Sequence, residues 1–168
     1  MKSFKWVNLF LLMMLIMVAP GKGQNGQPLS RISVKGNKFV DETGETLVFR
    51  GFNTSDPDKL EKNGHWDRQY LEEIKNWGAN IVRFPVHPRA WRERGQENYI
   101  TLLDKGVGWA TELGLYVIID WHVIGNLRTE MYQNPMYETT RKETYEFWRI
   151  MARHYKDNTT VAFFELFN

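Results

Sequence analysis

The sequence predicts an α/β protein in which a parallel β-sheet is covered by helices. Two observations support this fold class. Short, nearly continuous apolar segments alternate along the chain with amphipathic helical segments, which is typical of strands buried on both faces. A helix–glycine–strand junction also occurs twice, at residues 77–82 and 113–118, which indicates a repeated βα unit. Either an open doubly wound sheet or a (β/α)8 barrel fits this pattern.

The first elements after the N-terminal segment are expected to be strands. Residues 31–48 combine alternating apolar positions with two turn segments and predict a small β-hairpin, and residues 47–52 predict a buried strand. Residues 65–77 predict a helix that Gly78 ends. The apolar residues of this helix recur at helical spacing and are Trp66, Tyr70, Ile74 and Trp77.

Two more strand–helix units and a last strand follow. Residues 81–86 and 116–121 predict strands, with a helix at residues 101–113 between them. Residues 140–143 form a capping box that opens a third helix, and residues 161–167 predict the fourth strand. The apolar faces of the two helices are expected to consist of Leu103, Val107 and Ala110, and of Phe147, Met151 and Tyr155.

Residues 1–23 have the organisation of a secretory signal peptide. Two lysines precede an almost wholly apolar stretch, and small residues follow it. The apolar run at residues 9–19 is much shorter than the roughly 20 residues that a membrane-spanning helix needs. We therefore expect cleavage near residues 21–24 and a secreted or periplasmic mature protein that is not held in a membrane.

Composition excludes several classes of function. The chain has 22 basic and 20 acidic residues, and three of the lysines lie in residues 1–23, where there is no acid. The remainder is nearly neutral, so nothing in its charge favours a nucleic-acid partner. Without cysteine there is no disulfide, thiolate metal site or cysteine nucleophile. The four histidines have no metal-ligand spacing, so neither a metal nor another cofactor is expected.

Polar residues gather where the predicted strands end, which is where α/β proteins place their chemistry. Arg83 and His87 belong to the second strand and its loop, and His122 follows the third. The fourth strand carries Glu165 and leads to Asn168. No glycine-rich phosphate loop follows the first strand, which argues against a dinucleotide enzyme.

Four segments around these residues resemble glycoside hydrolase family 5, the cellulase and mannanase family of (β/α)8 barrels. The resemblance extends from about residue 34 to the end of the chain. It implies a TIM barrel of which about the first four βα units are present. The matching segments, in chain order, are Phe49-Arg-Gly-Phe-Asn53, Asn80-Ile-Val-Arg-Phe-Pro-Val86, Val117-Ile-Ile-Asp-Trp-His122 and Phe163-Phe-Glu-Leu-Phe-Asn168.

The resemblance also implies that residues 24–168 are the N-terminal half of a catalytic domain. In the family, the catalytic acid/base glutamate directly follows the asparagine that corresponds to Asn168, and the nucleophile lies near the end of the seventh strand. Both carboxylates would therefore lie beyond this chain, and we expect residues 1–168 alone to be inactive and to fold poorly.

The resemblance assigns catalytic roles to Arg83, His122 and Asn168. In retaining hydrolysis of a β-glycosidic bond, one carboxylate attacks the anomeric carbon and a second, about 5 Å away, acts as acid and base. Asn168 would bind the 2-hydroxyl group of the sugar, Arg83 would keep the nucleophile ionised, and His122 would bind a substrate hydroxyl. From the residues alone, Arg83 is also expected to pair with Glu165, because a charge in an apolar strand needs a partner.

Further residues are expected to line the substrate cleft or to support it. His87, Trp91 and Trp121 are predicted to bind substrate, Trp91 by offering a flat face to a sugar. Asp120 is expected to orient its neighbours. Glu165 is expected to be a buried structural carboxylate and not the catalytic acid.

Together these features predict a secreted endo-β-1,4-glucanase that acts on a plant-type polysaccharide with retention of configuration. A mannanase or xylanase of the same barrel is the alternative among enzymes. A carbohydrate-binding barrel without the carboxylate pair is the alternative outside them.

Overall fold

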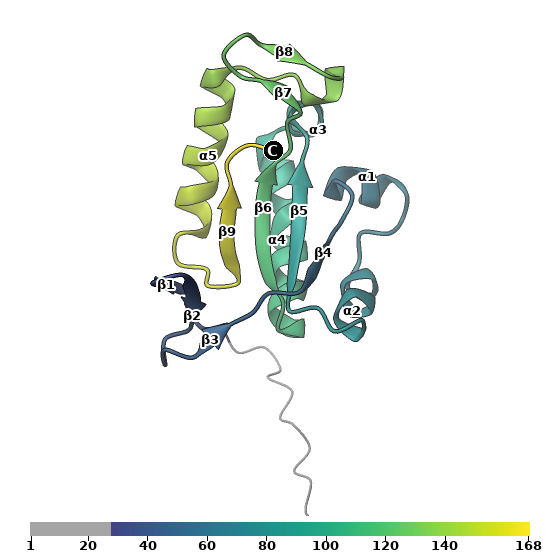
Figure 1. The fold of residues 1–168 in the computed structure, drawn as a ribbon. Coiled ribbons are helices and arrows are strands. Elements are labelled where there is room, and N and C mark those ends of the chain that lie inside the picture. Colours follow the sequence, from purple (N-terminus) through teal and green to yellow (C-terminus); the bar gives the residue numbers. More distant parts are fainter. Residues whose placement is uncertain (1–27) are drawn as a thin grey trace, which may run out of the picture.

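The computed structural model describes residues 28–168, and the predicted signal peptide lies outside them. Its centre is a parallel sheet of four strands (Figure 1), whose spatial order is the order in which they occur along the chain. The strands are β4 (Gly51–Asn53), β5 (Ile81–Val86), β6 (Tyr116–Trp121) and β9 (Val161–Glu165). The predicted parallel sheet is therefore confirmed.

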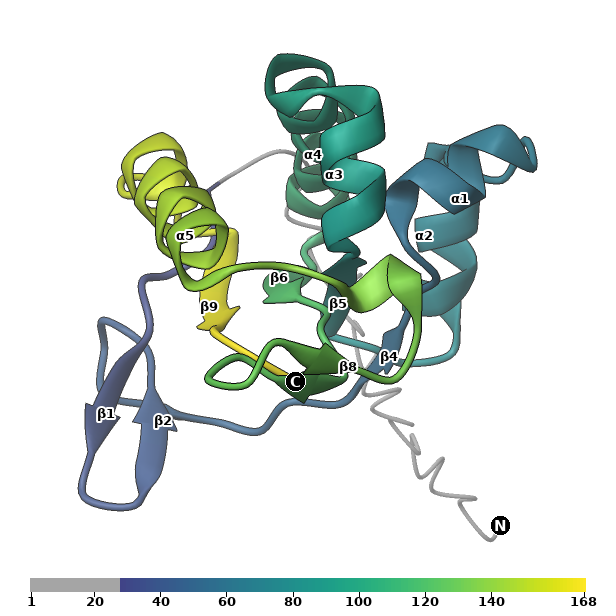
Figure 2. The same cartoon turned by 90° about the horizontal axis from the view of Figure 1, so that it is seen from above.

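Each pair of neighbouring strands is joined by a helical crossover. All of these helices lie on one side of the sheet, as the view along the strands shows (Figure 2). A doubly wound sheet would reverse its strand order and carry helices on both faces, so the arrangement is that of part of a (β/α)8 barrel. The crossover elements are α1 (Pro57–Lys62), α2 (Arg68–Asn76), α3 (Pro88–Arg94), α4 (Gln96–Leu113), β7 (Gly125–Asn126), β8 (Met131–Tyr132), the 3-10 helix η1 (Pro135–Tyr137) and α5 (Arg141–Tyr155).

The two faces of the sheet differ in burial. Side chains that point outward, toward the helices, form the core, and all six of those on β5 and β6 are fully buried. The alternate positions point inward and are less uniformly buried: Arg83, Ile118 and Phe163 are partly buried, whereas Asp120 is fully buried. Strand periodicity thus separates the apolar core from an inner face that carries charged side chains. The six outward residues are Val82, Phe84, Val86, Val117, Ile119 and Trp121.

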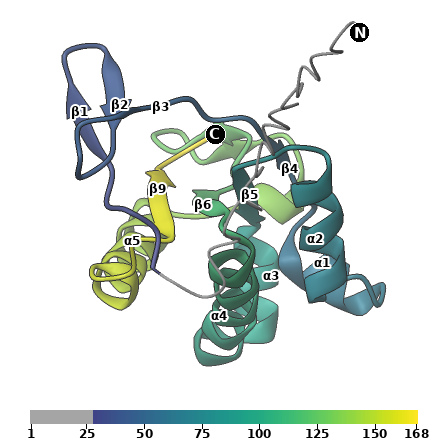
Figure 3. The ribbon, with the colours of Figure 1, turned by 90° about the horizontal axis from the view of Figure 1, so that it is seen from below.

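A small antiparallel sheet lies at the N-terminal end of the barrel strands (Figure 3). It consists of β1 (Ser33–Lys35), β2 (Lys38–Val40) and β3 (Thr46–Leu47), which confirms the predicted hairpin and adds a third strand. The ring of Phe39 contacts those of Phe49 and Phe163 edge to face, at centroid distances of 5.6 and 5.0 Å. This end of the sheet is therefore covered by aromatic packing.

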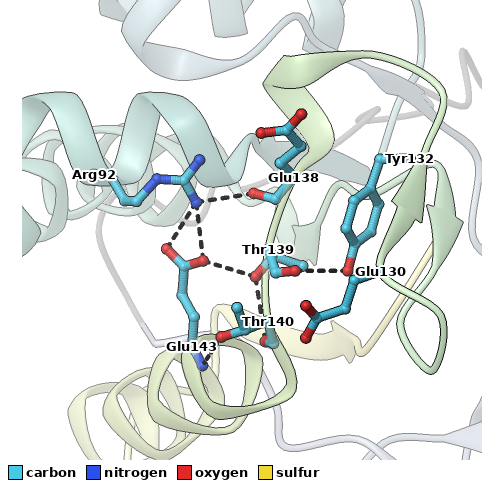
Figure 4. A pocket seen from close by; sticks show the side chains of 7 residues that line it. All are labelled: Arg92, Glu130, Tyr132, Glu138, Thr139, Thr140 and Glu143. Atoms are coloured by element: carbon cyan, nitrogen blue, oxygen red, sulfur yellow. Dashed lines mark hydrogen bonds and ion pairs between the residues drawn. The ribbon is translucent and has the colours of Figure 1, made fainter.

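The predicted N-terminus of α5 is confirmed. The hydroxyl oxygen of Thr140 accepts a hydrogen bond from the backbone N–H of Glu143 at 3.1 Å. The carboxylate of Glu143 does not return a bond to the cap as a full capping box would. It binds Arg92 of α3 and the hydroxyl of Thr139 instead, at the wall of a polar pocket of about 390 Å³ (Figure 4). Glu143 thus links the crossover that contains α3 to the crossover that contains α5.

Several boundaries differ from the sequence prediction. The strand expected at residues 47–52 is β4, which is exposed because it has a neighbour on one side only among the described strands. The helix expected at 65–77 begins at Arg68, capped by Asp67, and Trp77 is 77% exposed beyond its end.

Other boundaries shift less. The helix expected at residues 101–113 begins at Gln96, and the last strand ends at Glu165 instead of at residue 167. The short helices α1 and α3 were not predicted, although each has a proline at its first position. Within residues 28–168, no helix has the length and apolar character needed to cross a membrane.

Candidate active site

Arg83 stands at the centre of a charged cluster on the inner face of the sheet. From β5 its guanidinium reaches Glu165 of β9, with Nε–Oε2 and Nη2–Oε1 distances of 2.6 and 2.8 Å. Nη2 also lies 2.7 Å from Oδ2 of Asp120 on β6, and Nη1 donates to Asn53 of β4 at 3.3 Å. One side chain thus links all four strands, and the expected pair with Glu165 is present.

Burial and charge set the ionisation of this cluster. Hydrogen bonds from Arg83 hold the pKa of Glu165 below its ordinary value. Burial raises the pKa of Asp120 in spite of its contacts with His122 and Arg83. Burial alone would lower the pKa of Arg83, but Glu165 and Asp120 raise it, so the guanidinium stays charged. The guanidinium is therefore a charged group held between two carboxylates on the inner face of the sheet.

His122 follows β6 directly and is oriented by Asp120. Its Nδ1 lies 2.7 Å from Oδ2 of that carboxylate, whose side chain is fully buried. The other oxygen of Asp120 is buried without a hydrogen-bond partner among the described residues. Asp120 thus orients its neighbours, as expected.

His87 reaches the same place from the end of β5. It is the N-cap residue of α3, and its Nδ1 lies 2.8 Å from Oδ2 of Asp56. Its ring stands edge to face with that of His122, with centroids 5.1 Å apart. Tyr137 of η1 packs against both rings, at 5.6 and 5.7 Å.

Asn168 completes the group from the segment that follows β9. It is exposed, and its Nδ2 donates to Oε1 of Glu165 at 3.4 Å. The structure therefore brings together four of the six predicted site residues, which are Arg83, His87, His122 and Asn168.

Trp91 and Trp121, which were expected to bind substrate, lie elsewhere. Trp121 points outward from β6, is fully buried and stacks on Phe147 of α5 with centroids 4.1 Å apart. Its indole nitrogen donates to Thr144 at 3.2 Å. Trp91 is 7% exposed and packs against the same aromatic ring. Neither indole offers a face to a ligand on the inner side of the sheet, so both belong to the core.

Four residues of the cluster were not singled out from the sequence. They are Asn53, which binds Arg83, and Tyr137, which packs against the histidine rings. The other two are Asp56, which binds His87, and Tyr99, which donates a hydrogen bond to Asp56. The position of Asp56 could have been predicted as a helix N-cap, because an aspartate directly before a proline is typical of a helix N-terminus. No sequence pattern points to Tyr99, because it is a single tyrosine on the buried face of a helix.

The arrangement suits binding of a neutral, hydroxyl-rich ligand. It brings imidazole nitrogens, a carboxamide and a charged guanidinium together at the carboxyl ends of the strands, and within residues 28–168 no group of three acidic or histidine side chains could hold a metal ion. Of the three carboxylates in the cluster, Asp56 and Asp120 are buried, and Glu165 is held by two of the Arg83 nitrogens. None is free to attack a substrate.

Comparison with known proteins agrees with this geometry. The family model described as cellulase (glycosyl hydrolase family 5) matches residues 40–168. The chain belongs to glycosyl hydrolase family 5. The predicted resemblance is thus confirmed, and so is the fold, since the solved relatives are TIM barrels of this family.

The family members most similar to this chain include bacterial glucanases. A β-glucanase from Saccharophagus degradans, solved also in complex with cellotetraose, has a TM-score of 0.83 and 50% identity over 84% of this chain and 43% of its own. Endoglucanase A from Butyrivibrio fibrisolvens is 26% identical over 79% of this chain and 30% of its own length. An endoglucanase from Paenibacillus polymyxa is 27% identical over 80% and 38%. The chain spans less than half the length of these family 5 relatives.

Proposed function

We propose that this chain forms part of a secreted family 5 endo-β-1,4-glucanase that hydrolyses its substrate with retention of configuration. The observation that carries the proposal is the convergence of Arg83, His122 and Asn168 at the carboxyl ends of three neighbouring strands. The 50% identity to a β-glucanase that was solved with cellotetraose supports a β-glucan as the substrate.

The roles proposed for these residues follow from their contacts. The guanidinium of Arg83 stabilises a negative charge nearby, and a nucleophilic carboxylate beside it would stay ionised at neutral pH. The carboxamide of Asn168 and the imidazole of His122 offer hydrogen bonds to sugar hydroxyls, which strengthen as the oxocarbenium-like transition state forms. We expect the carboxylate pair to come from residues outside 28–168, so that residues 1–168 alone hydrolyse nothing.

The protein produced from its complete gene provides the direct test. We expect it to release soluble sugars from a β-1,4-glucan faster than from mannan or xylan, and the first product to carry the β-anomeric configuration in a time-resolved NMR spectrum. Faster release of soluble sugars from mannan or xylan would show that the proposed substrate is wrong and that the protein is a mannanase or xylanase. Binding without any hydrolysis would indicate a carbohydrate-binding barrel instead.

Substitution of Arg83 tests the site itself. Arg83→Lys keeps the charge but loses the paired hydrogen bonds to Glu165, so we expect kcat to fall about 10- to 100-fold. Arg68→Lys is a matched control, because Arg68 also binds two glutamates, Glu72 and Glu112, but on the outer surface. Steady-state kinetics on the same glucan measure both. A kcat for Arg83→Lys within about 2-fold of the unsubstituted protein would contradict the assignment.

Export is tested separately. N-terminal sequencing of the protein recovered outside the cytoplasm is expected to begin near residues 21–24. A protein that keeps residues 1–23 would contradict the proposed signal peptide.

A further inference from the structure

Two aspartate–histidine pairs meet at the carboxyl end of the sheet. Nδ1 of His87 lies 2.8 Å from Asp56, and Nδ1 of His122 lies 2.7 Å from Asp120. The exposed fractions of the two carboxylate side chains are only 2% and 0%. Oδ2 of each carboxylate also faces a second donor, the backbone N–H of His87 at Asp56 and Nη2 of Arg83 at Asp120, so it acts as an acceptor and we assign the proton of each pair to Nδ1. In the neutral ring, Nε2 is then the acceptor.

The two Nε2 atoms are available to a ligand. Neither atom makes a hydrogen bond to another residue in the part of the chain that the structure describes. The side chains of His87 and His122 are 13% and 19% exposed, so both rings are partly open to solvent. An acceptor nitrogen suits the O–H groups of a neutral sugar better than a carboxylate or phosphate, which has no proton to donate.

Asp56 is bound more fully than its role as a helix cap requires. Its Oδ1 accepts from the backbone of Asp58 at 2.7 Å and from the hydroxyl of Tyr99 at 2.6 Å. Its Oδ2 accepts from both the backbone N–H and the ring of His87, each at 2.8 Å. Tyr99 is fully buried on α4. The carboxylate therefore fixes the position and the tautomer of the His87 ring from beneath.

We propose that Asp56 and Tyr99 are positioning residues that fix His87, so that its Nε2, beside that of His122, accepts a hydrogen bond from a hydroxyl group of the bound sugar. The inference rests on the proposed glucanase function and extends it by assigning how His87 recognises the substrate. Tyr137 packs on both imidazoles and keeps either ring from turning away.

Two substitutions of His87 separate its two nitrogens. In His87→Asn the amide nitrogen takes the place of Nδ1 and keeps the bond to Asp56, but nothing takes the place of Nε2. In His87→Gln the amide takes the place of Nε2, and Asp56 loses its side-chain partner. We expect His87→Asn to lower kcat/KM for a β-1,4-glucan about 5- to 10-fold with little change in Tm. We expect His87→Gln to retain more of kcat/KM and to have the lower Tm.

Two buried tyrosines, Tyr99 and Tyr155, allow the positioning role to be tested with a matched control. Tyr99 donates to Asp56, which holds His87, and Tyr155 donates to Asp104 at 2.7 Å, which contacts His154 at 2.8 Å. Only the first group lies at the carboxyl ends of the strands. We expect Tyr99→Phe and Tyr155→Phe to lower Tm by similar amounts, whereas only Tyr99→Phe raises KM, about 3- to 10-fold.

Binding of cellotetraose, measured by calorimetry, distinguishes failure of the inference from failure of the proposed function. Weaker binding to His87→Asn supports the inference even if the unsubstituted protein hydrolyses nothing, a result that would overturn the glucanase function alone. Unchanged binding and kcat/KM in His87→Asn would overturn the inference, and so would equal effects of the two tyrosine substitutions on KM. A protein that neither binds nor hydrolyses the sugar would overturn both.

Discussion

Arg83 carries a positive charge into the inner face of an apolar strand, where it contacts two carboxylates, Asp120 on the adjacent strand β6 and Glu165 on β9, one strand further. That such a charge must be paired follows from the cost of burying it alone, and the pairing with Glu165 was predicted on that ground. The second contact, to Asp120, depends on the cross-strand register that brings β6 beside β5. Local sequence patterns do not specify this register, so the second contact could not be predicted.

The pairing gives the stability of the protein a pH dependence. Because Arg83 lowers the pKa of Glu165, the folded state holds this proton less tightly than the unfolded state. The stabilisation is complete above the ordinary glutamate pKa of about 4.3 and is lost as the pH falls through the lower folded value. With Glu165 about one third exposed, we expect Glu165→Gln to cost about 1 kcal/mol at pH 7.

Denaturant titrations of the unsubstituted protein and of Glu165→Gln between pH 7 and pH 3 measure the difference between their free energies of unfolding. We expect this difference to shrink as the pH falls and Glu165 takes up its proton. Asp120, whose pKa is raised by burial and to a smaller extent by the charge of Glu165, has the opposite pH dependence, and only the Glu165 contribution differs between the two proteins. A difference that stayed constant over this range would contradict the ion pair.

At the scale of elements, β6 shows both what the sequence predicted and where it failed. Its bounds agree with the prediction because a continuous apolar run between a glycine and polar residues is a strong strand signal. The same continuity hides which residues face inward, since a strand buried on both faces has no alternation. Asp120 and Trp121 are adjacent but point to opposite sides, so the indole expected at the substrate lies in the core.

Substitution of Trp121 tests its place in the core. We expect Trp121→Ala to cost about 3–5 kcal/mol of stability, because it leaves a cavity beside Phe147. The KM of the folded protein for glucan should stay close to that of the unsubstituted protein. Chemical denaturation and steady-state kinetics measure the two quantities. If Trp121→Ala raised KM strongly and left the stability unchanged, Trp121 would have to be a substrate-binding residue.

At the scale of the whole molecule, the sheet has two outer edges among the described strands. β4 and β9 each pair on one side only. Large apolar side chains lie exposed near both edges: Phe52 on β4 with Trp77 packed against it, and Leu166 just after β9. Unpaired edges with apolar neighbours favour association between chains. The sequence predicted four strands of a barrel, but not which apolar residues stay exposed, since that depends on what packs against them.

We therefore expect residues 28–168, produced alone, to associate as the concentration rises. Light scattering coupled to gel filtration measures the mass, and the protein from the complete gene serves as the comparison. A monomer that unfolds in one sharp thermal transition would show that the two edges are not a source of association.

The agreement between strand order and chain order has a consequence for synthesis on the ribosome. Each new strand adds to the edge left by the one before it, so the sheet can grow while the rest of the polypeptide is still being made. One contact that cannot form in this order is the aromatic contact of Phe39 with Phe163, which joins an early hairpin to the last strand of the series. The hairpin must wait for β9 to leave the ribosome before this contact can form, and only then is the lower end of the sheet closed.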